Sequence, residues 1–169
     1  MPPPLRAAAP FAIAYRPTTD DDLPFLAALY ASTRAEEVAV TGWPEDIQRQ
    51  FLTQQFEAQH RHYRAHYPEA EWLVVERGGE PVGRLYLEQW SGELRIIDIA
   101  LMPHARGLGL GAAMLEDILE QARHKGSGVS IHVEKNNPAM RLYRRLGFVP
   151  VADKGVYDLL LWSGEPADA

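Results

Sequence analysis

The stretch that decides the fold is I-D-I-A-L-M-P-H-A-R-G-L-G-L-G-A, which runs from Ile97 to Ala112. An apolar run ends at Pro103, and glycines at positions 107, 109 and 111 then open a segment with helical periodicity. Glycine lets the backbone approach a ligand closely, and the free N–H groups of a helix N-terminus bind anions. The stretch therefore predicts a strand, a phosphate-binding loop and a helix, in that order.

Two other phosphate-binding folds also use a glycine-rich loop between a strand and a helix. A P-loop requires Gly-Lys-Ser/Thr at the end of its glycine run, and no such sequence follows Gly111. A dinucleotide fold requires G-x-G-x-x-G, with an acidic residue about 20 positions later. The three glycines here are spaced two and two, which disfavours that fold. An ordinary tight turn before a helix remains the weaker alternative.

Further elements follow on both sides of this stretch from apolar periodicity and turn residues. Strands are predicted at residues 11–16, 72–77, 81–90, 94–102, 129–133, 148–151 and 156–162. Helices are predicted at residues 23–33, 44–66, 108–124 and 138–146. The order of these elements predicts a mixed α/β (α+β) fold, with helices on the faces of one sheet.

Composition limits the classes of protein to consider. The chain has 169 residues, of which 46% are hydrophobic, and this is enough for one packed domain. The net charge of −6 disfavours a nucleic-acid partner, which would require a basic surface. No apolar run approaches the ~18 residues of a membrane span. Cysteine is absent, which excludes thiolate chemistry and is compatible with a reducing, cytoplasmic compartment.

The domain boundaries come from the two ends of the chain. Residues 1–10 carry four prolines and are expected to be a disordered lead-in. Residues 11–162 hold every predicted element and are expected to form a single domain. Residues 163–169 are expected to be a polar tail.

Two motifs lie about 30 residues apart on the predicted elements. The first is Arg106-x-x-Gly109-x-Gly111, directly after an apolar strand. The second is N-N-P-A-M-R-L-Y-R-R-L-G-F, from Asn136 to Phe148. Together they resemble the GNAT superfamily of N-acetyltransferases, because the first matches its [Q/R]-x-x-G-x-[G/A] signature and because the order and placement of both motifs agree with that superfamily. The resemblance is clear from about residue 72 to residue 162, and it rests on element order alone before that.

The resemblance implies a fold, a reaction and a donor. It implies a central mixed, mostly antiparallel sheet of about seven strands flanked by about four helices. It also implies transfer of an acetyl group from acetyl-CoA to a primary amine, by direct attack and with no metal. The acceptor, a small molecule or a peptide, is left open, as is a homodimer. A non-catalytic module that binds acyl-CoA is the alternative function.

The resemblance also implies which residues bind the donor. The backbone at the end of the central strand would pair with the pantetheine arm, and the loop amides would hold the pyrophosphate. Either Asn136 or Asn137 would bind the arm, because counts from the two neighbouring elements differ by one residue. The implied donor-binding residues are Ile99, Ala100, Leu101, Arg106, Gly107, Leu108, Gly109, Leu110, Gly111, Ala112, Asn136, Asn137 and Tyr143.

Tyr143 and Asp98 are the candidate catalytic residues. The resemblance places Tyr143 beside the thioester sulfur. A phenol of pKa ~10 protonates a thiolate of pKa ~8.5 at a cost of about 2 kcal/mol, so a hydrogen bond or a water relay is equally plausible. Asp98 interrupts an apolar strand, which suggests a general base or a structural ion pair. Glu88 and His132 are the alternative bases.

Two further groups of side chains lie in the helices predicted before the sheet. His60, His62 and His66 have spacings that resemble a metal site, but no partner ligand is evident, so an exposed helix face is the preferred interpretation. By analogy with the superfamily, the first two helices and their connecting loop would form the acceptor pocket. The residues expected in it are Tyr30, Arg34, Glu37, Trp43 and Gln55.

Overall fold

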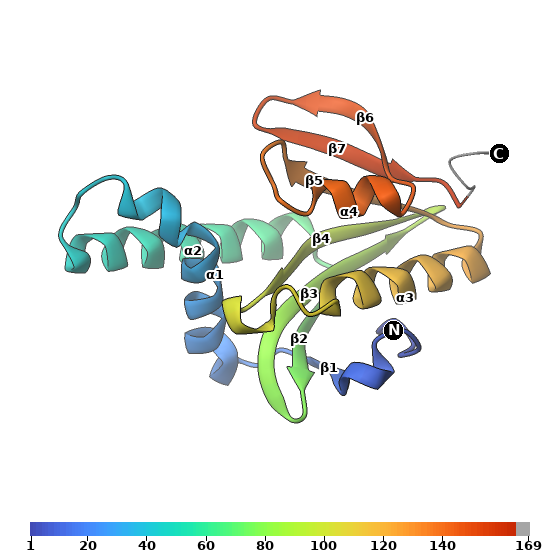
Figure 1. Cartoon of the computed structure of the whole chain (residues 1–169), viewed down its shortest axis with the longest axis horizontal. Coiled ribbons are helices and arrows are strands. Elements are labelled where there is room, and N and C mark those ends of the chain that lie inside the picture. The colour runs from blue at the N-terminus through green and yellow to red at the C-terminus, as the bar shows by residue number, and fades with distance from the viewer. Residues whose placement is uncertain (165–169) are drawn as a thin grey trace.

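A computed structural model describes residues 1–164 and shows one seven-stranded sheet with helices on both faces (Figure 1). The strands are β1 (Ile13–Pro17), β2 (Glu71–Arg77), β3 (Glu80–Trp90), β4 (Glu93–Leu101), β5 (Gly128–Glu134), β6 (Val149–Lys154) and β7 (Tyr157–Trp162). Their order across the sheet is β1-β2-β3-β4-β5-β7-β6, and β4 and β5 form the only parallel pair among these residues. The predicted mixed, mostly antiparallel sheet is therefore confirmed.

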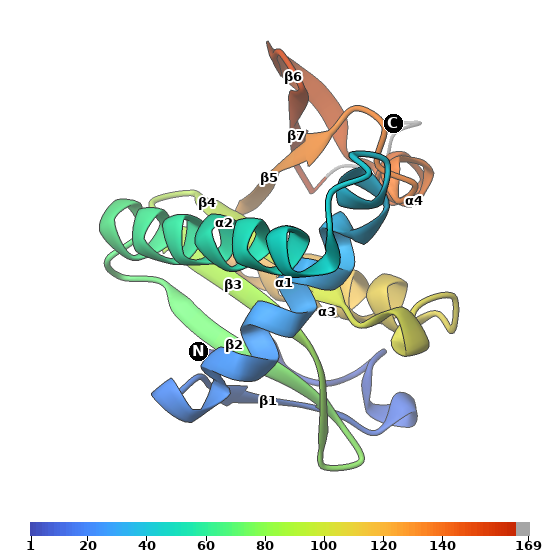
Figure 2. The same ribbon diagram turned by 90° about the vertical axis from the view of Figure 1, so that its left-hand side faces the viewer.

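The helices form two layers, one on each face of the sheet (Figure 2). They are α1 (Leu23–Ala39), α2 (Glu45–His66), α3 (Leu110–Lys125) and α4 (Met140–Arg145). Both α3 and α4 bury apolar side chains in the main core together with the sheet. On the opposite face, α1 and α2 pack on each other through the smaller cluster of Leu26, Tyr30 and Phe56.

Glycines explain the end of β2 and both ends of α3. The turn between β2 and β3 contains Gly78 and Gly79, both with positive φ, as a tight hairpin of this twist requires. The helix predicted to start at residue 108 instead starts at Leu110, because Gly109 has φ +87° and lies outside the helical region. At the other end of α3, Gly126 adopts φ +62° as the C-cap and donates its N–H to Ala122 and Arg123.

The N-terminal lead-in differs from the sequence prediction. Residues 6–8 of the predicted disordered segment lie against α3, where the buried carboxylate of Asp117 accepts hydrogen bonds from their backbone N–H groups. Ala8 is completely buried, and the 3-10 turn η1 (Ala9–Phe11) follows it. The first strand consequently begins at Ile13 rather than at Phe11.

The C-terminal tail and the first helix also differ from, or lie outside, what the sequence predicts. Of the expected polar tail, residues 165–169 lie outside the described part of the chain. The first helix continues six residues past its predicted end at Thr33, through R-A-E-E-V-A to Ala39, because nothing in that sequence breaks a helix. Within residues 1–164, no helix combines the length and the apolar character needed to cross a membrane.

Gly83 on β3 permits the close approach of β3 to the end of β4. A Cβ atom at this position would overlap the carbonyl oxygen of Ala100 and would lie 2.9 Å from a side-chain carbon of Leu101. We expect Gly83→Ala to lower the free energy of unfolding by about 1–3 kcal/mol, because the added methyl must push the strands apart. Urea denaturation measures this change.

Gly111→Ala is the matched control for that substitution. A Cβ at Gly111 makes only an ordinary contact, 3.9 Å from Leu101, and alanine favours a helix over glycine. This variant should be at least as stable as the wild type. Equal stability of the two variants would contradict the steric role assigned to Gly83.

Candidate active site

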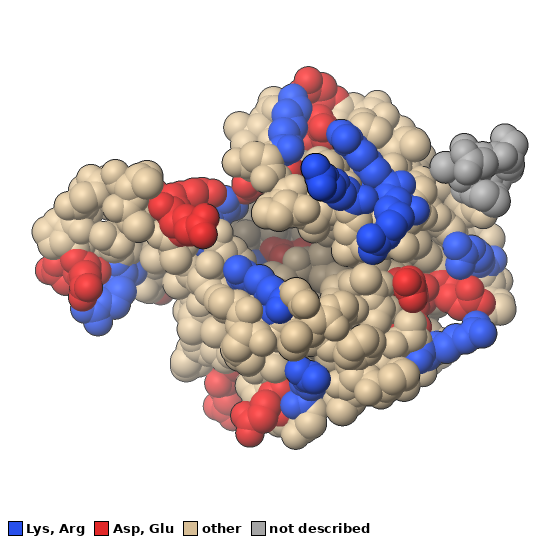
Figure 3. Space-filling view, in the orientation of Figure 1, with Lys and Arg blue, Asp and Glu red and all other residues tan. Residues whose placement is uncertain are grey.

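The central feature of the site is a parallel ladder that stops halfway along two strands. Strands β4 and β5 pair only from Glu93 to Ile96 and from Gly128 to Ile131. Both strands continue, β4 to Leu101 and β5 to Glu134, but they no longer pair with each other. The last five residues of β4 therefore leave one row of backbone polar groups open to a ligand. Figure 3 shows a hollow in the surface between the glycine loop with α3 and the β5–β7 lobe.

A β-bulge marks the point where the strands separate. Leu87 on β3 pairs with Ile96 and Tyr86 pairs with Asp98, so Ile97 is an extra residue on β4. A bulge reverses which side chains face each side of the sheet. Ile99 consequently packs on the main core, while Asp98 points to the opposite face, where it meets α2.

The glycine loop lies next to the open end of β4. Gly107 and Gly109 both have positive φ, at +72° and +87°. The first N–H groups of α3 have no partner within the helix, and the first turn carries no acidic residue. A loop of this kind, followed by a helix of 16 residues, is suited to a pyrophosphate.

Arg106 braces this loop. Its Nε donates a hydrogen bond to the carbonyl oxygen of Leu101 at 2.9 Å, and its Nη2 lies 3.4 Å from Oγ of Ser32 on α1. The guanidinium thus joins the loop, the end of β4 and the first helix. In this geometry the Arg106 guanidinium contacts groups of the protein, and its predicted contact with the donor stays a prediction.

The two asparagines after β5 have different environments. Oδ1 of Asn137 accepts the backbone N–H of Ala139 at 2.8 Å, and so it supports the turn into α4. Asn136 is exposed, and its side chain makes no hydrogen bond within residues 1–164. The geometry therefore favours Asn136 as the residue free to meet a ligand.

Tyr143 lies on α4 at the edge of the main core. Its side chain is buried, and its ring meets Phe148 edge-on at 5.5 Å. Burial, and to a smaller degree the charge of Asp98, raises the pKa of the Tyr143 phenol well above its ordinary value. A phenol in this state is a hydrogen-bond donor and a poor source of a proton.

Asp98 belongs to a polar cluster beneath α2. Its Oδ2 accepts a hydrogen bond from the Arg84 guanidinium at 2.6 Å and another from the Tyr63 hydroxyl at 3.1 Å. Arg84 is almost completely buried and also donates to Gln59 at 2.8 Å. Within residues 1–164, Oδ1 of Asp98 accepts no hydrogen bond, so one oxygen remains available.

The two alternative bases are already occupied. The oxygens of Glu88 accept hydrogen bonds from the Trp90 indole and the Glu69 backbone, and Glu88 pairs with Arg95 on the closed part of the sheet. Nδ1 of His132 lies 3.2 Å from the Arg95 guanidinium, which can only donate. The lone pair of His132 that would take a proton is therefore engaged, and burial together with Arg95 lowers the pKa of its imidazole.

A second group of polar side chains lies at the end of β5, beside the gap in which β4 and β5 no longer pair. We call this gap the split, and we call its end near Glu134 the mouth. Arg34 on α1 donates to Glu134, at the end of β5, at 2.7 Å. The Tyr157 hydroxyl lies 3.4 Å from the same Glu134 oxygen. The sequence interpretation named Arg34 but missed Glu134 on β5, Tyr157 on β7 and Tyr63 on α2. These residues come from four different elements, so no local spacing indicates that they meet.

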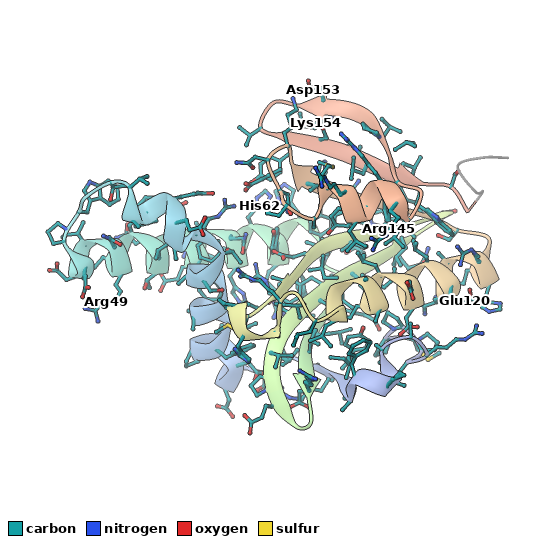
Figure 4. The ribbon with its side chains drawn as sticks, viewed as in Figure 1. Arg49, His62, Glu120, Arg145, Asp153 and Lys154 are labelled. Atoms are coloured by element: carbon teal, nitrogen blue, oxygen red, sulfur yellow. The ribbon has the colours of Figure 1, made fainter. Side chains whose placement is uncertain are left out.

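The acceptor pocket expected between the first two helices is only partly supported. Tyr30 is buried against Phe56 and serves as packing, while Arg34 and Glu37 do lie together at the mouth. Trp43 packs against Phe51 where α2 begins. That end of α2, marked by Arg49 in Figure 4, projects away from the sheet, so Trp43 lies outside the site.

The histidines of α2 show no metal-binding arrangement. The rings of His62 and His66 have centroids 4.0 Å apart and planes tilted by 32°, and Nδ1 of His66 is 3.1 Å from the carbonyl oxygen of His62. In the described part of the chain, no cluster of three or more His, Cys, Asp or Glu side chains is placed to hold a metal ion.

Comparisons with known proteins agree with this geometry. Residues 34–148, more than half of the chain, match the family model described as "Acetyltransferase (GNAT) family". A Bacillus subtilis protein named as a candidate ribosomal protein bS18-alanine N-acetyltransferase is 29% identical over 104 residues, which cover 56% of this chain and 69% of the relative. Streptothricin acetyltransferase of Streptomyces lavendulae is 34% identical over 82 residues, which cover 46% of this chain and 43% of the relative.

Solved structures share the fold at low sequence identity. The PaiA N-acetyltransferase of Thermoplasma acidophilum, determined in complex with coenzyme A, superposes with a TM-score of 0.65 at 14% identity. The superposition covers 89% of this chain and 98% of that one. The predicted superfamily fold is therefore confirmed over nearly the whole chain.

Proposed function

This chain belongs to the acetyltransferase (GNAT) family, and we propose that it uses the split between β4 and β5 to transfer acetyl from acetyl-CoA to a primary amine. The observation that carries the proposal is the unpaired end of β4, which lies directly beside a glycine loop that opens a helix. An extended arm with a pyrophosphate at its end fits these two features together.

The donor site is formed mainly by backbone groups. Among residues 97–101, the N–H and C=O groups that do not face β3 are suited to pair with the amides of the pantetheine arm, except the Leu101 carbonyl, which accepts from Arg106. The amides of residues 107–112 are suited to the pyrophosphate, and Asn136 to the arm on its other side. Backbone N–H groups near Leu101 would also stabilise the oxyanion that forms on the thioester carbonyl.

Transfer then requires an amine, a leaving sulfur and one proton acceptor. The lone pair of the neutral amine forms a bond to the thioester carbon, and the C–S bond breaks as the tetrahedral intermediate collapses. The Tyr143 hydroxyl donates a hydrogen bond to the sulfur as negative charge develops there. Because burial raises the pKa of this phenol, the support is a hydrogen bond rather than full transfer of the proton.

We assign the proton acceptor to Asp98, acting through a water molecule. It is close enough to Tyr143 for its charge to affect the pKa of that phenol, and its Oδ1 accepts no hydrogen bond in the described part of the chain. Arg84 and Tyr63 hold the other oxygen and so fix the orientation of the carboxylate. Asp98 therefore lies near Tyr143 and keeps one carboxylate oxygen free to accept a proton.

The acceptor is proposed to enter from the face covered by α1 and α2. The mouth there carries Glu134, Arg34 and Tyr157, so a cationic amine would meet a carboxylate before it reaches the thioester. The names of the two relatives point to different acceptors, an alanine of ribosomal protein bS18 and streptothricin. Both a peptide and a small molecule therefore belong in a test of substrate class.

Location and assembly follow as further proposals. The absence of cysteine supports a cytoplasmic protein, and the net charge of −6 supports an amine acceptor rather than a nucleic acid. We keep the homodimer as an expectation, which gel filtration with light scattering tests.

We expect thiol release from acetyl-CoA that depends on one class of amine in a panel of peptides, polyamines, aminoglycosides and amino acids. Tyr143→Phe should lower kcat about 10- to 100-fold, because the hydrogen bond to the leaving sulfur is lost. Its affinity for acetyl-CoA should stay within about twofold, since the backbone forms the donor site. Colorimetric thiol detection and calorimetry measure these two quantities.

Two outcomes of this experiment would contradict the proposal. If the wild-type protein does not bind acetyl-CoA, the donor site is wrong. If it binds acetyl-CoA but releases no thiol with any amine, the alternative function, a non-catalytic acyl-CoA-binding module, is preferred.

Asp98→Asn tests the base, and Arg84→Gln is its matched control. We expect Asp98→Asn to lower kcat about 100-fold, because the amide cannot accept the proton of the amine. Arg84→Gln breaks the same ion pair but keeps the carboxylate, so its kcat should fall much less. Steady-state kinetics at saturating donor and acceptor measure both values. If the two variants lose the same fraction of kcat, Asp98 has only a structural role.

A further inference from the structure

The N-terminal segment is fastened to α3 by a buried carboxylate. Asp117, 3% exposed, accepts three backbone N–H groups: Arg6 at 3.2 Å, Ala7 at 2.6 Å and Ala8 at 2.9 Å. Hydrogen bonds to an ionised acceptor are stronger than those between neutral groups. The segment therefore has a defined place on α3, although its proline-rich sequence indicates disorder (Figure 1).

A second attachment fixes the segment where it enters the sheet. The carbonyl oxygen of Phe11 accepts Nε of Arg77 at 3.3 Å, and that of Ala12 accepts the N–H of Gly78 at 3.0 Å. Ala12 has φ +58°, which turns the chain sharply between η1 and β1. Residues 6–12, which we call the N-terminal strap, thus run from α3 to the β2–β3 turn.

The strap places one aromatic ring against the glycine loop. A Cβ built on Gly109 would lie 3.6 Å from Cζ and 3.9 Å from Cε1 of Phe11. Gly109 is the N-cap of α3 with φ +87°, and the first N–H groups of the helix have no partner within it. The Phe11 ring is also part of the wall of the main core. The Phe11 ring therefore links the main core to Gly109, and glycine is the residue with the greatest backbone freedom.

We infer that Phe11 is a positioning residue for the donor site and that the strap holds the glycine loop in its anion-binding shape. Glycines allow the loop to approach a ligand, but they also allow many other conformations, and ordering them costs entropy when the ligand binds. A ring packed against Gly109 limits those conformations before binding, so less affinity is lost. The inference rests on the proposed function, because it takes this loop to be the pyrophosphate site.

Phe11→Ala tests the inference, because it should weaken the binding of the donor without changing the turnover number. We expect the Kd for acetyl-CoA to rise about tenfold, since small displacements of a binding group have effects of this size. The kcat at saturating donor and the KM for the amine should each change by less than about twofold, because neither depends on the loop once it is occupied. Phe11→Leu should recover much of the affinity, since a branched apolar side chain still fills the contact.

Asp117→Asn tests the fastening itself, and Phe56→Ala is the control for stability. Asparagine keeps the shape of the aspartate but replaces one acceptor oxygen by a donor, so the acetyl-CoA Kd should rise in the same direction as for Phe11→Ala. Phe56 is a phenylalanine buried in the separate α1–α2 cluster. Its replacement should lower the melting temperature without changing the Kd for acetyl-CoA.

The outcomes separate this inference from the proposed function. If the wild type binds acetyl-CoA and Phe11→Ala binds it equally tightly, the strap has no part in the donor site. A rise in Kd of equal size in Phe56→Ala would reduce the effect to general stability and would overturn the inference as well. If the wild type does not bind acetyl-CoA, the proposed function fails and the inference fails with it.

Discussion

The early end of the β4–β5 ladder is the constraint on which the rest of the site depends. Parallel strands in a sheet normally satisfy each other's backbone groups, and here they stop doing so after Ile96 and Ile131. The bulge at Ile97 marks the point of separation and also turns Asp98 toward α2. One irregularity of the backbone therefore opens a row of hydrogen-bonding groups and orients the candidate base.

The two faces of the sheet carry different groups. On one face, α3, the glycine loop and α4 present backbone amides and the Tyr143 phenol, which are suited to an anionic donor and its sulfur. On the other face, α1 and α2 bring charged groups such as Arg34 to the end of β5. Donor and acceptor can thus reach the split from opposite sides, so direct transfer needs no covalent intermediate on the protein.

Local patterns in the sequence predicted the parts of the site that are local in the fold. The glycines before α3 and the motif around Tyr143 each lie within one short segment, so their places at the start of α3 and on α4 could be predicted, while their roles toward the donor stay predictions. Arg84 and Tyr63 meet Asp98 from β3 and from α2, contacts that no spacing encodes. The N-terminal strap escaped prediction for a related reason, because its partner Asp117 lies more than 100 residues away.

The measurement that tests the central claim most directly is backbone amide hydrogen exchange with and without coenzyme A. The account predicts that added coenzyme A slows exchange in two segments above all, the unpaired end of β4 and residues 107–112, because both donate N–H groups to the ligand. The paired part of β4, up to Ile96, should serve as an internal reference with little change. Slower exchange confined to other regions, or none at all, would contradict the assignment of the split as the donor site.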